Sequence, residues 1–258
     1  SSSPPPFHLL DIGCGSGKLT RAFAAHFAAA GFPAARVTGV DISAAVLVSA
    51  RAQAEAEGFG PNVRFLRADP KGGGLPFEES RFDVVHCHQV LAHVSRPADA
   101  IAEMIRVVKK RRTGPPPGGL ICLREGDLTT VRVTPASPLL EECFGVICAA
   151  HRSQGGEPAA GRHLAEWARE AIARKRWGEG GQRGKEEKKK KKKGKNAEAD
   201  REAYGGHWPG RCRQGMFFEA AAAMGVPSGR MEEYALAWRR WIEDPMARIE
   251  MVHAEVLI

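Results

Sequence analysis

Short apolar runs alternate along the chain with longer stretches in which apolar residues recur at helical spacing. The first run, His8–Ile12, predicts a buried strand, and the alanine-rich stretch Lys18–Ala30 predicts the helix that follows it. Strand and helix then alternate through the first half of the chain, which favours a mostly parallel α/β sheet with right-handed crossovers. The further predicted strands are Arg36–Asp41, Val63–Ala68, Phe82–His88 and Gly118–Glu125, and the further helices are Ala44–Glu57 and Pro97–Lys109.

A glycine-rich turn separates the first predicted strand from the first predicted helix. Gly13, Gly15 and Gly17 alternate there with small residues. A strand, a glycine turn and a helix in this order present backbone N–H groups to a nucleotide-like ligand. Glycine suits such a turn because it tolerates positive φ and has no Cβ to keep a ligand away from the main chain.

The spacing of this turn narrows the class of ligand. Dinucleotide-binding turns favour G-x-G-x-x-G, whereas here the third glycine comes one residue earlier and Asp11 precedes the turn. The form Asp-x-Gly-x-Gly-x-Gly resembles motif I of the class I S-adenosylmethionine-dependent methyltransferases. The resemblance implies that S-adenosylmethionine is the cofactor.

Acidic residues follow the second and third predicted strands. In sheets of this type an acid such as Asp41 accepts hydrogen bonds from ribose hydroxyls, and Ser43 then suits the N-cap of the next helix. The resemblance implies that Asp69 accepts the adenine amine, although an Asp before Pro70 is also typical of a simple turn. The cofactor-binding residues implied are Asp11, Gly13, Cys14, Gly15, Gly17, Asp41, Ile42, Ala68, Asp69, Pro70 and His88.

A second signature spans Phe82–Val94. Its Phe-Asp-Val-Val start, Val-Leu pair and later histidine resemble the ubiquinone/menaquinone-biosynthesis-like methyltransferases. His88 and His93 are therefore the candidate catalytic residues. His88 equally suits a lining role in the cofactor pocket, and His93 a structural hydrogen bond that closes the loop. Glu125 and Asp127, expected just after the fifth strand, either face the substrate or are ordinary solvated loop acids.

The resemblance extends over about Leu9–Gly126 and more loosely beyond. It implies a Rossmann-like sheet of seven strands with helices on both faces, and a terminal strand His253–Ile258 that lies antiparallel at the edge. Gly156–Ala171 resembles the helix that follows the fifth strand in these enzymes. No stretch between 171 and 203 suits the sixth strand, so a low-complexity insert is expected to disrupt the C-terminal edge. The expected organisation is a flexible lead at 1–6, a cofactor-binding core at 7–150, and C-terminal helices with the terminal strand at 151–258.

Most of the net positive charge of the chain lies in one short segment. The formal net charge is +8, and residues 183–195 contain nine basic and two acidic residues, a net of +7, which leaves +1 for the rest. We therefore expect no nucleic-acid-binding face on the core. The insert at about 177–196 is expected to be disordered, because such a block self-repels. A solvated loop, a nuclear-import or polyanion-binding tract at Lys188–Lys193, and a membrane-surface contact stay open.

Hydropathy and cysteine spacing indicate the cellular location that we expect. Hydrophobic residues make up 43% of the chain, no apolar run reaches the ~18 residues of a membrane span, and Ser1–Pro6 lacks the apolar segment of a signal peptide. The six cysteines form no C-x-x-C pair, so neither a metal site nor a disulfide framework is indicated. A reducing, cytoplasmic location is expected.

Aromatic residues recur near the C-terminus. Met231, Tyr234, Trp238 and Trp241 follow helical spacing after Ser228, which predicts either the core face of a helix or an apolar lid over a substrate. Trp167 and Trp208 admit the same two interpretations.

The function expected from these patterns is methyl transfer from S-adenosylmethionine to a small, mostly apolar metabolite. Two alternatives stay open. A NAD(P)-dependent oxidoreductase is disfavoured by the glycine spacing and because neither Tyr204 nor Tyr234 has a lysine four residues on. The second alternative is a non-catalytic or regulatory protein, in which the motifs bind S-adenosylmethionine but no methyl group is transferred. The acceptor and the oligomeric state do not follow from the sequence.

Overall fold

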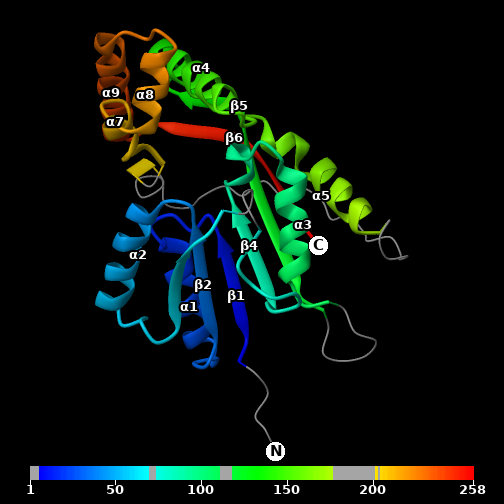
Figure 1. Cartoon of the computed structure of the whole chain (residues 1–258). Helices are drawn as coiled ribbons and strands as arrows, with labels where there is room; N and C mark the ends of the chain where they lie inside the picture. The colour runs from blue at the N-terminus through cyan, green and yellow to red at the C-terminus, as the bar shows by residue number, and fades with distance from the viewer. Residues whose placement is uncertain (1–5, 70–73, 111–117, 177–200, 203) are drawn as a thin grey trace, which may run out of the picture. The chain divides into compact units, whose positions relative to one another are not determined.

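The computed structural model of the chain describes residues 6–69, 74–110, 118–176, 201–202 and 204–258 (Figure 1). The chain divides into two compact units. Unit 1 consists of Ser1–Glu125, His163–Lys188 and Glu255–Ile258, and unit 2 of Gly126–Arg162 and Lys189–Ala254. The lysine-rich segment 177–196 lies outside the described residues.

The strands form one sheet in the order β3-β2-β1-β4-β5-β6. Strands β1, β2, β3 and β4 belong to unit 1, whereas β5 and β6 contribute residues to both units. Every predicted strand is present, so the α/β, Rossmann-like fold is confirmed. The strands are β1 His8–Ile12, β2 Arg36–Asp41, β3 Val63–Arg67, β4 Val84–His88, β5 Leu120–Thr134 and β6 Arg248–Leu257.

The central strands are parallel, so their carboxyl ends meet at one edge. In β1, Asp11 pairs with Gly39 of β2 on one side and with His86 of β4 on the other. β3 continues the parallel pairing beyond β2, and β5 continues it beyond β4. Such an edge is where open α/β sheets bind ligands.

The last strand closes the sheet at its edge. Ile121 and Ile258 exchange backbone hydrogen bonds of 2.9 and 3.1 Å, the reciprocal pattern of an antiparallel pair. Arg124 and Glu255 lie across this pair, with Nε 3.4 Å from Oε1. The antiparallel terminal strand is therefore confirmed. The described residues contain six strands rather than the seven that the resemblance implies.

The helices after β1, β2 and β4 are as predicted, whereas the unpredicted helix α4, Pro138–Ser153, follows β5 ahead of the one expected at Gly156–Ala171. Ser43 is the N-cap of α2, since its hydroxyl accepts the N–H of Val46. In the view of Figure 1, α1 lies behind the strands of unit 1 and α3 in front of them, so both faces are covered. The helices that begin in unit 1 are α1 Lys18–Ala29, α2 Ala44–Ala56 and α3 Pro97–Val107, with the short 3-10 helix η1 Leu91–His93; α5 Ala160–Arg176 begins in unit 2.

Apolar side chains on the strands give unit 1 its core. Leu10 and Ile12 of β1 and Val40 of β2 are fully buried, because both faces of a parallel sheet are covered. A second layer forms where α1 and α2 pack on β2 and β3, with Leu47, Ala50 and Phe65 at its centre. This packing fixes the strand ends from which the polar residues project.

The fifth strand is longer than predicted. It runs to Thr134 instead of ending at Glu125, and both Glu125 and Asp127 lie inside it, 1% and 3% exposed. Of the two alternatives for Glu125 and Asp127, the one that makes them solvated loop acids is therefore wrong. The run Leu128–Thr134 is rich in the β-branched residues Thr and Val, which favour a strand, so the predicted end at Glu125 came too early. Distant residues satisfy its polar groups, as when Arg162 pairs with Asp127.

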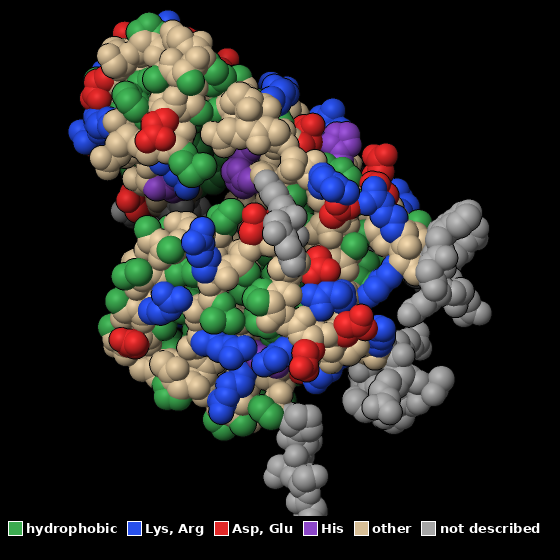
Figure 2. All heavy atoms as spheres, viewed as in Figure 1, with side chains coloured by type: hydrophobic (Ala, Val, Ile, Leu, Met, Phe, Trp, Pro, Cys, Tyr) green, Lys and Arg blue, Asp and Glu red, His purple; other side chains and the backbone are tan. Residues whose placement is uncertain are grey.

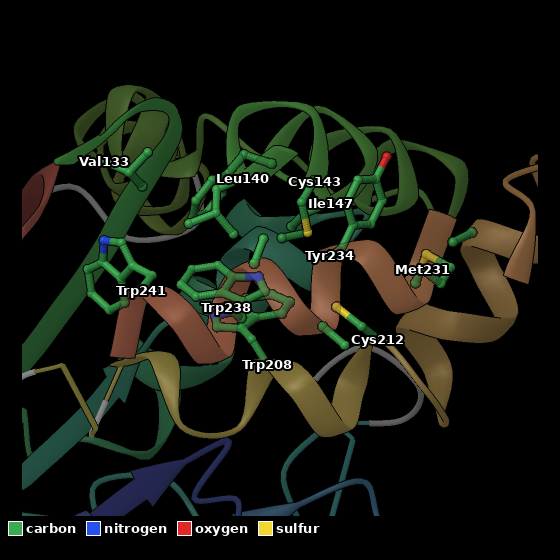
Figure 3. Packing of buried hydrophobic residues seen from close by; sticks show 14 of the residues in the cluster. Val133, Leu140, Cys143, Ile147, Trp208, Cys212, Met231, Tyr234, Trp238 and Trp241 are labelled. Carbon is green, nitrogen blue, oxygen red and sulfur yellow. The ribbon is translucent and has the colours of Figure 1, made fainter. Parts of the chain in front are cut away.

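Unit 2 has an aromatic core. Figure 3 shows Trp208, Trp238 and Trp241 packed together, and the Trp208 and Trp238 rings stack with centroids 5.7 Å apart. Met231, Tyr234, Trp238 and Trp241 are at most 4% exposed, so the core interpretation of this helix face is confirmed and the lid interpretation is wrong. The helices are α4 Pro138–Ser153, α7 Trp208–Arg211, α8 Met216–Ala223 and α9 Ser228–Glu243.

The described surface is mixed in charge. Figure 2 shows basic and acidic side chains interspersed on the face of unit 1 that it presents. This fits the net charge of +1 that remains outside residues 183–195, since the chain totals +8 and that segment +7. None of the helices among the described residues is long and apolar enough to cross a membrane.

Candidate functional site

The glycine turn lies between β1 and α1 at the carboxyl edge of the sheet. Gly13, Gly15 and Gly17 all have positive φ, at 66°, 52° and 72°. The turn is tied to the neighbouring strand because the N–H of Cys14 donates to the carbonyl of Val40 at 3.0 Å. Burial, with Asp11 and Asp41 nearby, raises the pKa of the Cys14 thiol to about 12. Cys14 is therefore a neutral spacer rather than a nucleophile.

The glycines of the turn differ in what surrounds them. A Cβ at Gly13 would collide with the side chain of Val90, and one at Gly17 would lie 2.6 Å from the ring of Phe65. At Gly15 a Cβ would meet nothing within 4 Å. Two of the glycines are thus required by packing inside the protein, whereas Gly15 turns its bare backbone toward open space. That is the position at which a ligand can approach the main chain.

Asp41 lies at the end of β2, opposite this turn. Its Oδ2 accepts the N–H of Gly15 at 2.9 Å, and its Oδ1 accepts the N–H of Ser43 at 2.9 Å. An ionised carboxylate has about four acceptor positions, so roughly two remain after these bonds. Asp41 can therefore fix the glycine turn and still accept two donors from a ligand.

Asp11 has a different environment from Asp41. It is 2% exposed, its Oδ2 accepts the hydroxyl of Thr20 at 2.6 Å, and its Oδ1 lies 2.8 Å from Nδ1 of His86. Both oxygens thus have partners inside the protein. This arrangement ties β1, α1 and β4 together beneath the turn.

The ends of β2 and β3 bring further predicted residues to the same edge. Ile42 directly follows Asp41 and is 57% exposed, so its apolar side chain is accessible at this edge. Ala68 is buried, and its N–H donates to the carbonyl of Asp41 at 3.1 Å. Asp69 comes next and is half-buried, whereas Pro70 lies outside the described residues.

The two candidate histidines follow β4. His88 is its last residue and is half-buried, with its ring centroid 6.2 Å from that of His86. His93 ends η1 and is exposed. Between them, Gln89 has φ of 55°, a left-handed conformation that is rare for residues with a side chain. The segment Gln89–His93 therefore turns sharply away from the strand.

Glu125 approaches this segment from β5. Its Oε1 accepts the N–H groups of Val90 at 2.8 Å and Leu91 at 2.7 Å. Burial raises the pKa of Glu125 to about 7, although backbone N–H groups of Leu91, Val90 and Ala92 lower it in part. Its Oε2 is buried without a hydrogen-bond partner among the described residues.

Asp127 forms a separate structural cluster in unit 2. Its Oδ2 accepts the guanidinium of Arg162 at 2.9 Å, and its Oδ1 accepts the backbone N–H of Thr129 at 3.1 Å. These contacts involve both carboxylate oxygens, and the bond to Arg162 connects β5 with the start of α5.

Two of these residues, His86 and Val90, were not among the candidates from the sequence. His86 shares a strand face with His88, two positions away, which was a usable signal for proximity. Its contact with Asp11 depends on the strand register. Val90 shows no polar chemistry in the sequence, and its packing against Gly13 and its bond to Glu125 are purely tertiary.

Residues 9–111 match a family model described as "Methyltransferase domain". A relative in Schizosaccharomyces pombe, named as an uncharacterized methyltransferase, is 32% identical over 169 residues, 63% of this chain and 55% of that protein. The ubiquinone/menaquinone biosynthesis C-methyltransferase UbiE of Stutzerimonas stutzeri is 38% identical over 117 residues, 45% of this chain and 41% of that protein. The chain thus spans about half the length of the curated relatives it matches.

Solved structures resemble the fold over nearly the whole chain. The YcgJ protein of Bacillus subtilis superposes with a TM-score of 0.53 at 20% identity, covering 99% of this chain and 92% of that one. A [4+2]-cyclase named SpnF gives a TM-score of 0.51 at 20% identity, covering 98% and 74%. At this identity the likeness concerns the fold alone, and one fold supports different chemistries.

The residues of the site fit S-adenosylmethionine. The open space at Gly15 admits a ligand against the main chain, and the remaining acceptor positions of Asp41 suit the two hydroxyls of a ribose. The exposed side chain of Ile42 offers an apolar surface beside them. Neither an oxidoreductase nor a non-catalytic regulator gains support from the relatives.

Proposed function

We propose that the chain transfers a methyl group from S-adenosylmethionine to a small, mostly apolar metabolite, because residues 9–111 match a methyltransferase-domain family model and a UbiE C-methyltransferase is 38% identical over 117 residues. The reaction class is thus a 2.1.1-type methyl transfer. The names of the relatives support an acceptor of this kind, since they include C- and O-methyltransferases of ubiquinone biosynthesis.

The observation on which this proposal depends is the pair formed by Gly15 and Asp41. The N–H of Gly15 donates to Asp41 while the other side of Gly15 faces open space. The bonds to Gly15 and Ser43 use only part of the accepting capacity of Asp41, so roughly two acceptor positions remain beside the open face of Gly15. The pair has the form expected of a ribose site.

The remaining predicted residues extend this site along the strand ends. In the proposal, Asp41 accepts the ribose hydroxyls, Ile42 contacts the adenine ring, and Ala68, Asp69 and Pro70 form the adenine end. Gly13, Cys14 and Gly17 shape the turn, and Asp11 fixes it from below through Thr20 and His86. These roles follow from the position of each residue at the carboxyl edge of the sheet.

S-adenosylmethionine, when bound, supplies a methyl group on a positively charged sulfur. The chain needs only to bind the cofactor, orient the acceptor and exclude water, since the displacement requires no covalent bond to the protein. His88 lines the pocket at the end of β4 in this proposal. His88 and His93 are the candidate bases for an acceptor that must lose a proton.

Isothermal titration with S-adenosylhomocysteine tests the cofactor site directly. We expect micromolar binding that Asp41→Ala weakens strongly. Glu55→Ala is the matched control, because it removes an exposed carboxylate of unit 1 on α2. Failure of the folded protein to bind would contradict the proposal. Binding without turnover on any acceptor would favour the non-catalytic alternative.

A further inference from the structure

Glu125 combines complete burial with an ionisable group. It is 1% exposed, and its carboxyl lies in β5 rather than in a loop. Buried carboxyls are rare unless paired or hydrogen-bonded, because removal from water penalises the charge. The methyl transfer proposed above gives Glu125 no role. Its contacts must therefore explain why this position holds an acid.

The contacts of Glu125 converge on the segment after β4. A single oxygen, Oε1, accepts the N–H groups of both Val90 and Leu91. These backbone groups belong to the turn into η1, where no regular ladder would satisfy them. Two charge-assisted bonds to adjacent backbone groups fix the direction of the chain at this point.

The side chain of Val90 packs this fixed segment against the glycine turn. It fills the space that a Cβ on Gly13 would need. The preceding residue, Gln89, has a left-handed backbone, and its N–H donates to the carbonyl of Arg124 at 2.9 Å. The segment is thus held from β5 through both Arg124 and Glu125. A strained conformation at Gln89 persists only where its surroundings enforce it.

We propose that Glu125 is a positioning residue of the methyl-transfer site, which fixes the segment Gln89–His93 against the glycine turn and so sets the place of His88 and His93. This inference rests on the proposed function, because it concerns the geometry of the same cofactor site. Glu125 acts through Val90 and Leu91 and does not itself touch the cofactor.

The protonation of Glu125 adjusts the strength of this contact. Burial raises its pKa to about 7, so the group changes charge near neutral pH. The Cys87 thiol of β4 faces the same carboxyl, and burial together with the Glu125 charge raises the pKa of that thiol, which stays neutral. An ionised carboxylate is the stronger acceptor of the two N–H groups. The contact between Glu125 and the segment therefore changes with pH near 7, whereas a glutamine at this position would give no such change.

Three variants separate this role from general stability. Glu125→Ala removes the acceptor, whereas Glu125→Gln keeps one amide oxygen for Val90 and Leu91 but cannot ionise. Glu255→Gln is the matched control, since it makes the same change at an exposed residue of unit 1. Each full-length protein is studied by hydrogen exchange and by titration with S-adenosylhomocysteine between pH 6 and pH 8.

In Glu125→Ala we expect faster exchange at 89–93 by at least tenfold, with β1 protected as in the parent protein, and at least tenfold weaker S-adenosylhomocysteine binding. Glu125→Gln should restore most of the protection and bind within about threefold of the parent at pH 6. It should also lack the pH dependence of affinity that the parent shows between pH 6 and pH 8. Glu255→Gln should match the parent in every measurement.

Two results would overturn the inference. One is unchanged exchange at 89–93 in Glu125→Ala. The other is faster exchange throughout unit 1 with unaltered cofactor affinity, which would show a purely structural group. If the parent protein bound no S-adenosylhomocysteine at all, the proposed function would fail, whereas the exchange data would still report on the contact between Glu125 and the segment.

Discussion

The backbone N–H of Gly15 donates to Oδ2 of Asp41 across 2.9 Å, joining the glycine turn after β1 to the end of β2. The carboxylate of Asp41 therefore both fixes the glycine turn and lies where a ligand can bind. Loss of Asp41 therefore disturbs the site twice, through the missing ligand contact and through the freed turn.

Asp41→Ala should weaken S-adenosylhomocysteine binding by about 1.5–3 kcal/mol, roughly tenfold to a hundredfold, the scale of charge-assisted hydrogen bonds. Calorimetry measures this directly. Asp41→Asn should lie between the parent and Asp41→Ala, because its amide keeps one acceptor oxygen. Equal affinity in all three proteins would remove Asp41 from the cofactor site.

Gly15→Ala should mainly weaken cofactor binding, whereas Gly13→Ala should mainly lower stability. At Gly15 the new Cβ meets open space, so only the positive φ of 52° opposes it and stability falls by about 1–2 kcal/mol. Cofactor binding should nevertheless be lost or greatly weakened, since the Cβ occupies the ligand's approach, and Gly15→Val should abolish it.

At Gly13 the Cβ collides with Val90, so Gly13→Ala should destabilise unit 1 more than Gly15→Ala does. Urea denaturation and calorimetry on both proteins check the pair. Wild-type affinity in Gly15→Val would refute the assignment of the turn.

The pH dependence of stability should report on Glu125. Its pKa in the folded protein is about 7, against an ordinary value of 4.5, so between these values the folded chain keeps a proton that the unfolded chain has lost. The free energy of unfolding contributed by this group therefore falls as pH rises from about 5 to about 7, by up to about 3 kcal/mol. Glu125→Gln should abolish that component. Denaturant unfolding of both proteins across this range measures the difference, and parallel curves would contradict it.

Trp238→Ala should destabilise unit 2 by about 3–5 kcal/mol, because the ring is fully buried against Trp208, Phe144 and Trp241. Trp167, by contrast, is half-buried on α5 and stacks on His163, so Trp167→Ala should cost less. Chemical denaturation followed by circular dichroism distinguishes the two. A Trp238→Ala protein of parent stability would mean that the ring is not a core residue.

The sequence alone determined the order of strands and helices in unit 1. Local periodicity and the glycine turn predict β1, α1 and β2 nearly to the residue, since these features depend on neighbours within a few positions. Ser43 was predictable as an N-cap for the same reason, because capping is a local contact. The family motifs followed from spacing, and the match over residues 9–111 agrees with them.

The tertiary structure decided which of the polar residues are buried together. The burial of Glu125 depends on tertiary contacts, since its partners Val90 and Leu91 lie 35 and 34 positions away. The packing of Val90 on Gly13 and the contact of His86 with Asp11 likewise depend on strand register. Register is set by the packing of the whole sheet, so no local pattern in the chain could specify these contacts.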